Sequence, residues 1–261
     1  MKLVMTIVIY ALLFAGPAGA VFAQEKPQPA KAAEAGAKTT TVEPTVDQIL
    51  DKYIQAGGGR QAVEKITSRV TKGTVELSAM GLKGEIESYA KAPNKTLTII
   101  NFSGLGEFRE GYDGKIAWSQ NPMMGLREKS GDELAAIAQT SDIHAQIKTR
   151  RLYSKLEFKG KEKVENRETY VILATPAIGA PLKMYFDTQT GLMARTDIDF
   201  ETPQGRFHLE STTDDYREVD GVKIAFLARQ KTSAADFVIK LTEVKHNVAI
   251  DDAKFNKPSG Q

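Results

Sequence analysis

The first periodic pattern of apolar and polar residues begins at Thr45 and has the spacing of a helix. In TVDQILDKYIQAGGG the apolar residues recur every three or four positions, and Thr45 with Gln48 forms a capping box. Gly57 stands where a glycine often ends a helix. The pattern therefore predicts an amphipathic helix, followed by one or two helical turns over 61–66. The apolar face of the helix is formed by Val46, Ile49, Leu50, Tyr53 and Ile54.

Two runs of strand pattern follow, separated by a second helical stretch that begins near Ser130. Glycine, proline and asparagine mark the turns, and apolar residues alternate within several segments, as in Leu97 with Ile99. The first run predicts strands over 69–77, 84–90, 95–102, 107–112 and 115–120. The second predicts strands over 155–159, 169–174, 182–187, 192–200, 206–216, 222–230 and 236–244. The pattern therefore predicts a mainly β, α+β fold made of two strand meanders.

The residues before Thr45 carry a different signal. Lys2, the apolar run over 3–14 and the small residues before Gln24 predict a cleavable secretory signal peptide over 1–23. The apolar run is shorter than the roughly 18 residues that a membrane-spanning helix needs. Residues 24–44 are rich in Ala, Lys, Pro and Thr, which predicts a disordered linker. We expect residues 45–261 to form a single domain in the periplasm.

Composition narrows the choice of partners. The chain contains no cysteine, so we expect neither disulfides nor a cysteine-linked lipid anchor. Removing Lys2 with the signal peptide lowers the formal net charge from +2 to +1, which is too small a bias to predict a nucleic-acid or anionic-membrane partner. No later segment is apolar for long enough to predict a transmembrane helix. We therefore expect an unanchored monomer.

The sequence offers no convincing catalytic constellation. His144, His208 and His246 are far apart in the chain, and without cysteine a structural zinc site is not expected. There is no Gly-x-Ser-x-Gly motif, and the glycines at 57–59 follow a helix instead of joining a strand to one. We therefore expect no enzyme activity, no metal and no cofactor. A hydrolase with a dispersed site ranks third, after the two binding functions given below.

The apolar residues around the turn at Asn121 and Pro122 allow two interpretations. Trp118, Met123 and Met124 lie close together in the sequence there, and methionine side chains adapt to apolar ligands of variable shape. They form either a hairpin packed on its own core or the rim of an apolar pocket.

The order of these features resembles the bacterial lipoprotein-carrier superfamily, the LolA-like periplasmic and outer-membrane lipoprotein-sorting proteins. The best local match is the Asp-x-x-Thr-Gly-Leu hairpin at 187–192, in YFDTQTGLMARTD, together with YAKAPNK at 89–95 and EGYDGKIAW at 110–118. The resemblance covers most of 45–257. It implies an incomplete antiparallel β-barrel, a curved sheet with helices covering its concave face, whose apolar inside accepts acyl chains. The linker and the missing lipidation cysteine depart from that pattern, and no functional residue carries over by number.

The resemblance implies a periplasmic protein that binds or carries a free lipid or the acyl chains of a lipoprotein by enclosing them in an apolar cavity. The alternative is an envelope sensor or interaction module that docks a protein partner. The expected lid residues are Ile49, Leu50 and Tyr53 of the first helix. The residues expected to line the cavity are Leu97, Ile99, Phe108, Trp118, Met123, Met124, Met184 and Phe186.

Overall fold

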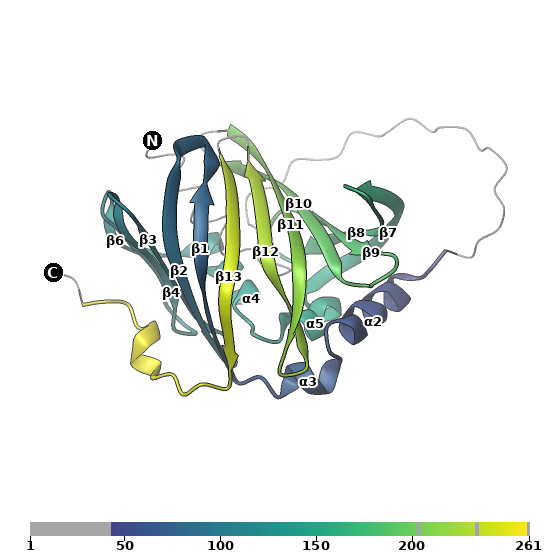
Figure 1. Cartoon of the computed structure of the whole chain (residues 1–261), viewed down its shortest axis with the longest axis horizontal. Helices are drawn as coiled ribbons and strands as arrows, with labels where there is room; N and C mark the ends of the chain where they lie inside the picture. The colour runs from purple at the N-terminus through teal and green to yellow at the C-terminus, as the bar shows by residue number, and fades with distance from the viewer. Residues whose placement is uncertain (1–42, 203–204, 233–234, 260–261) are drawn as a thin grey trace.

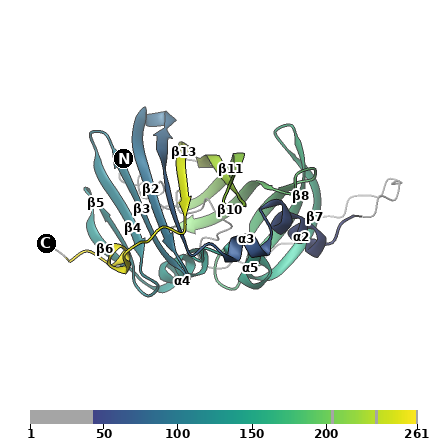
Figure 2. The ribbon, with the colours of Figure 1, turned by 60° about the horizontal axis from the view of Figure 1, so that its bottom comes forward.

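A computed structural model describes residues 43–202, 205–232 and 235–259 of the chain. The signal peptide expected over 1–23 and nearly all of the expected linker lie outside the described residues. The described residues form a strongly curved sheet with helices gathered at one end and inside its curve (Figures 1 and 2).

The structure contains the two meanders that the pattern predicts. The first half consists of α2 (Val46–Ala56), α3 (Arg60–Glu64), β1 (Ser68–Leu77), a 3-10 turn η1 (Ser78–Met80), β2 (Leu82–Lys91), β3 (Lys95–Phe102), β4 (Gly106–Tyr112), β5 (Ala117–Asn121) and β6 (Gly125–Lys129). The helical insert is α4 (Gly131–Thr140) and α5 (Ala145–Leu152). The second half consists of β7 (Tyr153–Val164), β8 (Arg167–Pro176), β9 (Leu182–Asp187), β10 (Met193–Thr202), β11 (Gly205–Val219), β12 (Val222–Thr232), β13 (Asp236–His246) and the 3-10 turn η2 (Asp252–Phe255).

All thirteen described strands belong to one sheet, in the order β6-β5-β4-β3-β2-β1-β13-β12-β11-β10-β9-β8-β7. Every neighbouring pair is antiparallel, and the two meanders meet where β1 pairs with β13. Strands β6 and β7 are the two ends of this order, so the sheet does not close into a barrel. The predicted fold, a mainly β, incomplete antiparallel barrel with covering helices, is confirmed.

Local chemistry accounts for the element boundaries. Thr45 and Gln48 form both hydrogen bonds of the predicted capping box at the start of α2. Asp220 and Gly221 both have positive φ, the conformation of the two-residue turn that Asp-Gly favours between β11 and β12. Strand β6, a five-residue edge strand of sequence GLREK, is not predicted by the pattern because its mostly polar residues give no clear alternation.

The C-terminal segment, residues 247–259, crosses the outer face of the first meander. There the outer cluster contains Val70, Leu97, Trp118, Ile250 and Phe255, with Tyr89, Ile99 and Leu126 packed against it. The indole Nε1 of Trp118 donates to the carbonyl oxygen of Phe255 at 3.0 Å. This segment therefore covers apolar residues on the face opposite the helices.

Two ion pairs at Asp252 also hold the C-terminal segment against the first meander. Lys91 and Lys95 place their Nζ atoms 2.6 and 2.9 Å from the two carboxylate oxygens of Asp252. The two ammonium groups lower the pKa of the Asp252 carboxyl to about 2. Asp252 therefore stays ionised and paired at any physiological pH.

Gly111 makes the position of Trp118 possible. These residues are directly opposite each other on β4 and β5, and a Cβ at residue 111 would overlap the indole ring. We expect Gly111→Ala to lower the free energy of unfolding by about 1–3 kcal/mol, as other overpacked sites do. Denaturant unfolding followed by circular dichroism measures the loss. In a Trp118→Leu background the same change should cost much less, and an equal cost in both backgrounds would contradict this account.

Candidate functional site

The concave face of the sheet and the helix α2 together enclose one large apolar cluster, here called the interior cluster. Both meanders contribute to it, because the β1–β13 pairing places their concave faces side by side. Its buried members are Ile49, Leu50, Tyr53, Val75, Leu77, Ile86, Ile100, Phe102, Phe108, Tyr153, Ile172, Ala174, Leu182, Met184, Phe186, Met193, Ile198, Phe207, Leu209, Ala228, Ala235, Phe237 and Ile239. The concave face is where the family resemblance implies an apolar cavity.

Helix α2 packs its apolar face onto this cluster. Leu50 is fully buried, and Ile49 and Tyr53 are 3% and 7% exposed. The ring of Tyr53 lies 5.1 Å, centroid to centroid, from the ring of Phe186 on β9. The expected lid residue Tyr53 thus contacts the expected wall residue Phe186 directly, and Ile49 and Leu50 belong to the same cluster.

The 187–192 hairpin holds helix α2 in place. Asp187 Oδ1 accepts hydrogen bonds from the backbone N–H groups of Gln189 and Thr190, which shapes the turn. Lys52 of α2 then donates from Nζ to the Thr188 carbonyl at 2.7 Å. Gly191 has positive φ, and a Cβ there would lie 2.7 Å from Lys52 Cγ. The motif that carried the family resemblance is thus the seat of the covering helix.

A second polar contact joins α2 to α5. Arg150 donates from Nε to Asp47 Oδ1 at 2.6 Å and from Nη2 to Asp51 Oδ1 at 3.0 Å. These carboxylates are mostly exposed, so the ion pairs are screened by solvent and contribute little to stability. Apolar packing therefore provides most of the energy that docks α2, and the ion pairs orient it.

The structure separates the expected cavity-lining residues into three groups. Phe108, Met184 and Phe186 are buried in the interior cluster, and Met123 packs against it from the β5–β6 turn. Met124, in the same turn, is 51% exposed. Leu97, Ile99 and Trp118 belong to the outer cluster beneath the C-terminal segment. The expectation that these eight residues line one wall is corrected accordingly.

Strand register explains the division. Phe108 is directly opposite Ile100 across the β3–β4 pair, so both point to the concave face. Ile99, one residue earlier, points the other way, and Leu97 shares its face. Strand β3 is apolar on both faces, because helices and sheet cover one and the C-terminal segment covers the other. The sequence alternation cannot indicate which of the two faces is concave.

A buried amide on the concave face is not among the residues that the sequence predicts for the site. Gln230 of β12 is fully buried, directly opposite Ser211 on one side and Phe237 on the other. Neither Nε2 nor Oε1 of Gln230 has a hydrogen-bond partner. Leaving a buried polar group unpaired costs about 1–3 kcal/mol. The signal in the sequence is that glutamine interrupts the apolar series Phe226, Ala228 on that strand.

A buried ion pair lies at the β4–β6 edge, below the start of α4. Lys129 Nζ lies 2.6 Å from Glu110 Oε1, and the Lys129 and Glu110 side chains are 1% and 8% exposed. Glu110 Oε2 has no hydrogen-bond partner. Burial raises the pKa of the Glu110 carboxyl, against the opposing effect of the Lys129 ammonium. Removing Lys129 would leave the Glu110 carboxylate buried without its counter-ion, which is strongly destabilising. The pair therefore holds β4 and β6 in their relative positions at this end of the sheet.

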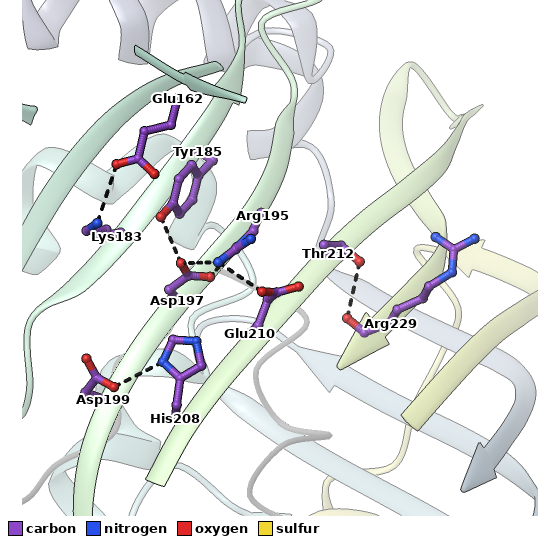
Figure 3. Close-up of polar contacts among 10 residues, drawn as sticks. All are labelled: Glu162, Lys183, Tyr185, Arg195, Asp197, Asp199, His208, Glu210, Thr212 and Arg229. Carbon is purple, nitrogen blue, oxygen red and sulfur yellow. Dashed lines mark hydrogen bonds and ion pairs between the residues drawn. The ribbon is translucent and has the colours of Figure 1, made fainter. Parts of the chain in front are cut away.

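An ion-pair network lies on the outer face of the second meander (Figure 3). Arg195 Nη2 lies 2.6 Å from Asp197 Oδ2 and 2.9 Å from Glu210 Oε2, and the Tyr185 hydroxyl donates to Asp197 at 2.8 Å. One ligand atom each from Asp197, Glu210 and His208 lie within 4.8 Å of one another. The β10–β11 register, which places Asp197 opposite Glu210, brings this group together. The residues lie on different strands, so their spacing in the sequence does not indicate it. Because the Arg195 guanidinium already pairs with both carboxylates, the group acts as a structural ion-pair network.

Comparison with known proteins identifies the fold. No protein-family model matches the chain, and no curated protein matches it. A DUF1329 family protein from Desulfovibrio piger is 16% identical, with 81% of this chain and 97% of that chain covered and a TM-score of 0.57. A LolA superfamily protein from Nitrosomonas europaea is 13% identical, with 82% and 99% covered and a TM-score of 0.57. The chain has the LolA-like fold.

A third solved structure extends the comparison. It is a domain from Vibrio parahaemolyticus with a suggested role in outer membrane lipoprotein sorting, 13% identical, with 80% of this chain and 97% of that chain covered and a TM-score of 0.53. The family resemblance found in the sequence is thus confirmed at the level of the fold. Within the described ranges, no helix has the length and apolar character needed to cross a membrane.

The burial of α2 leads to a direct test. We expect Leu50→Ala to lower the free energy of unfolding by about 2–5 kcal/mol, because it leaves a cavity under a fully buried side chain. Gln55→Ala, on the exposed side of the same helix, should change it by less than about 0.5 kcal/mol. Chemical denaturation followed by circular dichroism measures both. Equal small effects would show that α2 is not packed against the sheet in solution.

Proposed function

We propose that this protein binds the acyl chains of a lipid or lipoprotein in the periplasm, by enclosing them between the concave sheet and helix α2. The observation that carries the proposal is the interior cluster itself. Apolar residues of both meanders face one another across the curve of an unclosed sheet, and a separate amphipathic helix covers them. No catalytic group is needed, because each buried methylene contributes about 0.8 kcal/mol to binding.

The way α2 is held supports a role as a lid. Its apolar face is buried, yet its polar contacts to the rest of the molecule come from exposed or half-exposed side chains, Lys52 and the Asp47–Arg150 pair. Such contacts are weak in water and re-form easily. Displacing α2 outward would expose the interior cluster to an incoming acyl chain, which would in turn replace the apolar contacts of the helix.

The proposed location rests on the N-terminal sequence. Lys2, the apolar run over 3–14 and the small residues before Gln24 are those of an exported protein, and the domain that follows has no cysteine for an anchor. A fold related to that of a LolA superfamily protein accords with an envelope function.

Ligand retention tests the proposal directly. Protein isolated from an envelope extract of its native host should carry one or more lipids, seen as added mass in native mass spectrometry. Met184→Gln, which puts an amide into the interior cluster, should weaken binding of the fluorescent fatty acid cis-parinaric acid while the protein still folds. Lys183→Gln, on the outer face of the same strand, should bind as the wild type does. Lipid-free protein isolated with a stable protein partner would instead support the envelope sensor.

A reversible lock tests the lid. Because the chain has no cysteine, Lys52→Cys with Gly191→Cys places a single pair of thiols between α2 and the 187–192 hairpin, at a contact close enough for a disulfide. We expect the oxidised variant to take up cis-parinaric acid at least about tenfold more slowly than the reduced one, with uptake restored by dithiothreitol. Gly191→Cys alone carries the same backbone strain and is the matched control. Equal uptake by the oxidised and reduced forms would exclude entry beneath α2.

A further inference from the structure

We propose that Gln230 recognises the head of the bound acyl chain, and that the ligand is therefore an acyl chain attached through an amide. This inference rests on the proposed function and adds the chemical class of the ligand. Its basis is the side chain of Gln230, which is fully buried on the concave face with both of its polar atoms unpartnered.

The position of Gln230 places its amide at the apolar interior. It lies between Ala228 and Thr232 on β12 and directly opposite Phe237 on β13, and both Ala228 and Phe237 belong to the interior cluster. A residue two positions along a strand shares its face, so Gln230 points the same way as Ala228. The amide is thus directed toward the surface on which an acyl chain would lie.

A purely structural role does not account for this residue. A methionine has almost the same length and shape and would fill the position without leaving a donor and an acceptor unpaired. Buried polar side chains in folded proteins are overwhelmingly hydrogen-bonded, and an unpaired one calls for a partner from outside the chain. A ligand that supplies the missing hydrogen bonds meets that requirement.

The two free atoms define the chemistry of the partner. Nε2 offers donors and Oε1 offers an acceptor, so a matching group must both accept and donate. A hydrocarbon does neither. An ester or a carboxylate accepts only, and would leave Oε1 buried and unpaired. A secondary amide carries both an acceptor, its carbonyl oxygen, and a donor, its N–H, so it can pair with either atom of Gln230, and of these groups it alone can donate to Oε1.

The place of Gln230 along the strand also orients the ligand. At the other end of β12, the N–H of Lys223 donates to the Gly57 carbonyl in the α2–α3 connection. Seven residues separate Lys223 from Gln230, a distance of about 23 Å along an extended strand. The amide head would thus lie toward the end of the sheet remote from α3, with the hydrocarbon chain running back toward α2 and α3.

The test compares three ligands of equal length, N-methyldecanamide, methyl decanoate and dodecane, each displacing cis-parinaric acid from the full folded chain. Each dissociation constant is compared between wild type and Gln230→Met, so that the solubility of each ligand cancels. We expect the substitution to weaken the amide about tenfold and the ester less, to leave dodecane unchanged or tighter, and not to lower the unfolding midpoint. Gln120→Met, on the outer face of β5, is the matched control and should change none of these values.

The outcomes that overturn the inference are distinct. Equal weakening of all three ligands in Gln230→Met would assign Gln230 a packing role, and no weakening of any would show that water or nothing occupies its amide. If Gln230→Met fails to fold, Gln230→Leu replaces it in the same comparison. If the wild type binds cis-parinaric acid but neither Gln230→Met nor Gln230→Leu changes the affinity for N-methyldecanamide, only the role of Gln230 is refuted. Wild-type protein that binds none of the four probes refutes the proposed function itself.

Discussion

The pairing of β1 with β13 is the interaction on which the rest of this structure depends. It joins residues 160 or more positions apart, as in Val75 with Ile239 and Leu77 with Phe237, and these pairs are themselves part of the interior cluster. Without it the molecule would be two separate meanders, each with one apolar face exposed to water. With it, the two concave faces become one continuous surface. Gly73 makes the close approach possible, because a Cβ there would overlap the Lys240 carbonyl at the irregularity in this pairing.

An unclosed sheet with an apolar concave face needs a cover, and the position of α2 follows from that need. The amphipathic pattern from Val46 to Ile54 supplies the apolar side, and the 187–192 hairpin supplies the seat. The outer face has its own, separate cover in the C-terminal segment, which is bound by Trp118 and by the Lys91–Asp252 pair. The two covers differ in role. The C-terminal segment completes the packing of the outer cluster, whereas α2 lies over the surface that we propose holds a ligand.

Much of the fold could be predicted from the sequence, but the site only in part. Helix caps, turn residues and period-two alternation are local signals, so α2, α3, the helical insert and twelve of the strands follow from them. The choice of face is not local. Whether Ile99 or Ile100 points inward depends on the partner strand, the curvature of the sheet and the segment at 247–259. For the same reason the sequence pattern does not show that Trp118 and Leu97 lie in the outer cluster, whereas Phe108, Met184 and Phe186 lie in the interior cluster. The local signal for the buried amide of Gln230 is only the interruption of an apolar series, and its burial depends on its neighbours in the sheet.

The unpaired ends of the sheet, β6 and β7, have a consequence for the range of cargo. In a closed barrel the number of strands and their stagger fix the radius, so the inside has one size. Among the described residues no strand pairing joins β6 to β7, which are connected only through the helical insert α4–α5. Lysines at 155, 159, 161 and 163 keep the β7 edge charged, which disfavours pairing with another strand. The width enclosed by the curved sheet is therefore not fixed by closure, and it changes with the twist between neighbouring strands. In the proposed binding role, a change in this twist would let one chain enclose molecules of different cross-section while every ladder of backbone hydrogen bonds stays intact.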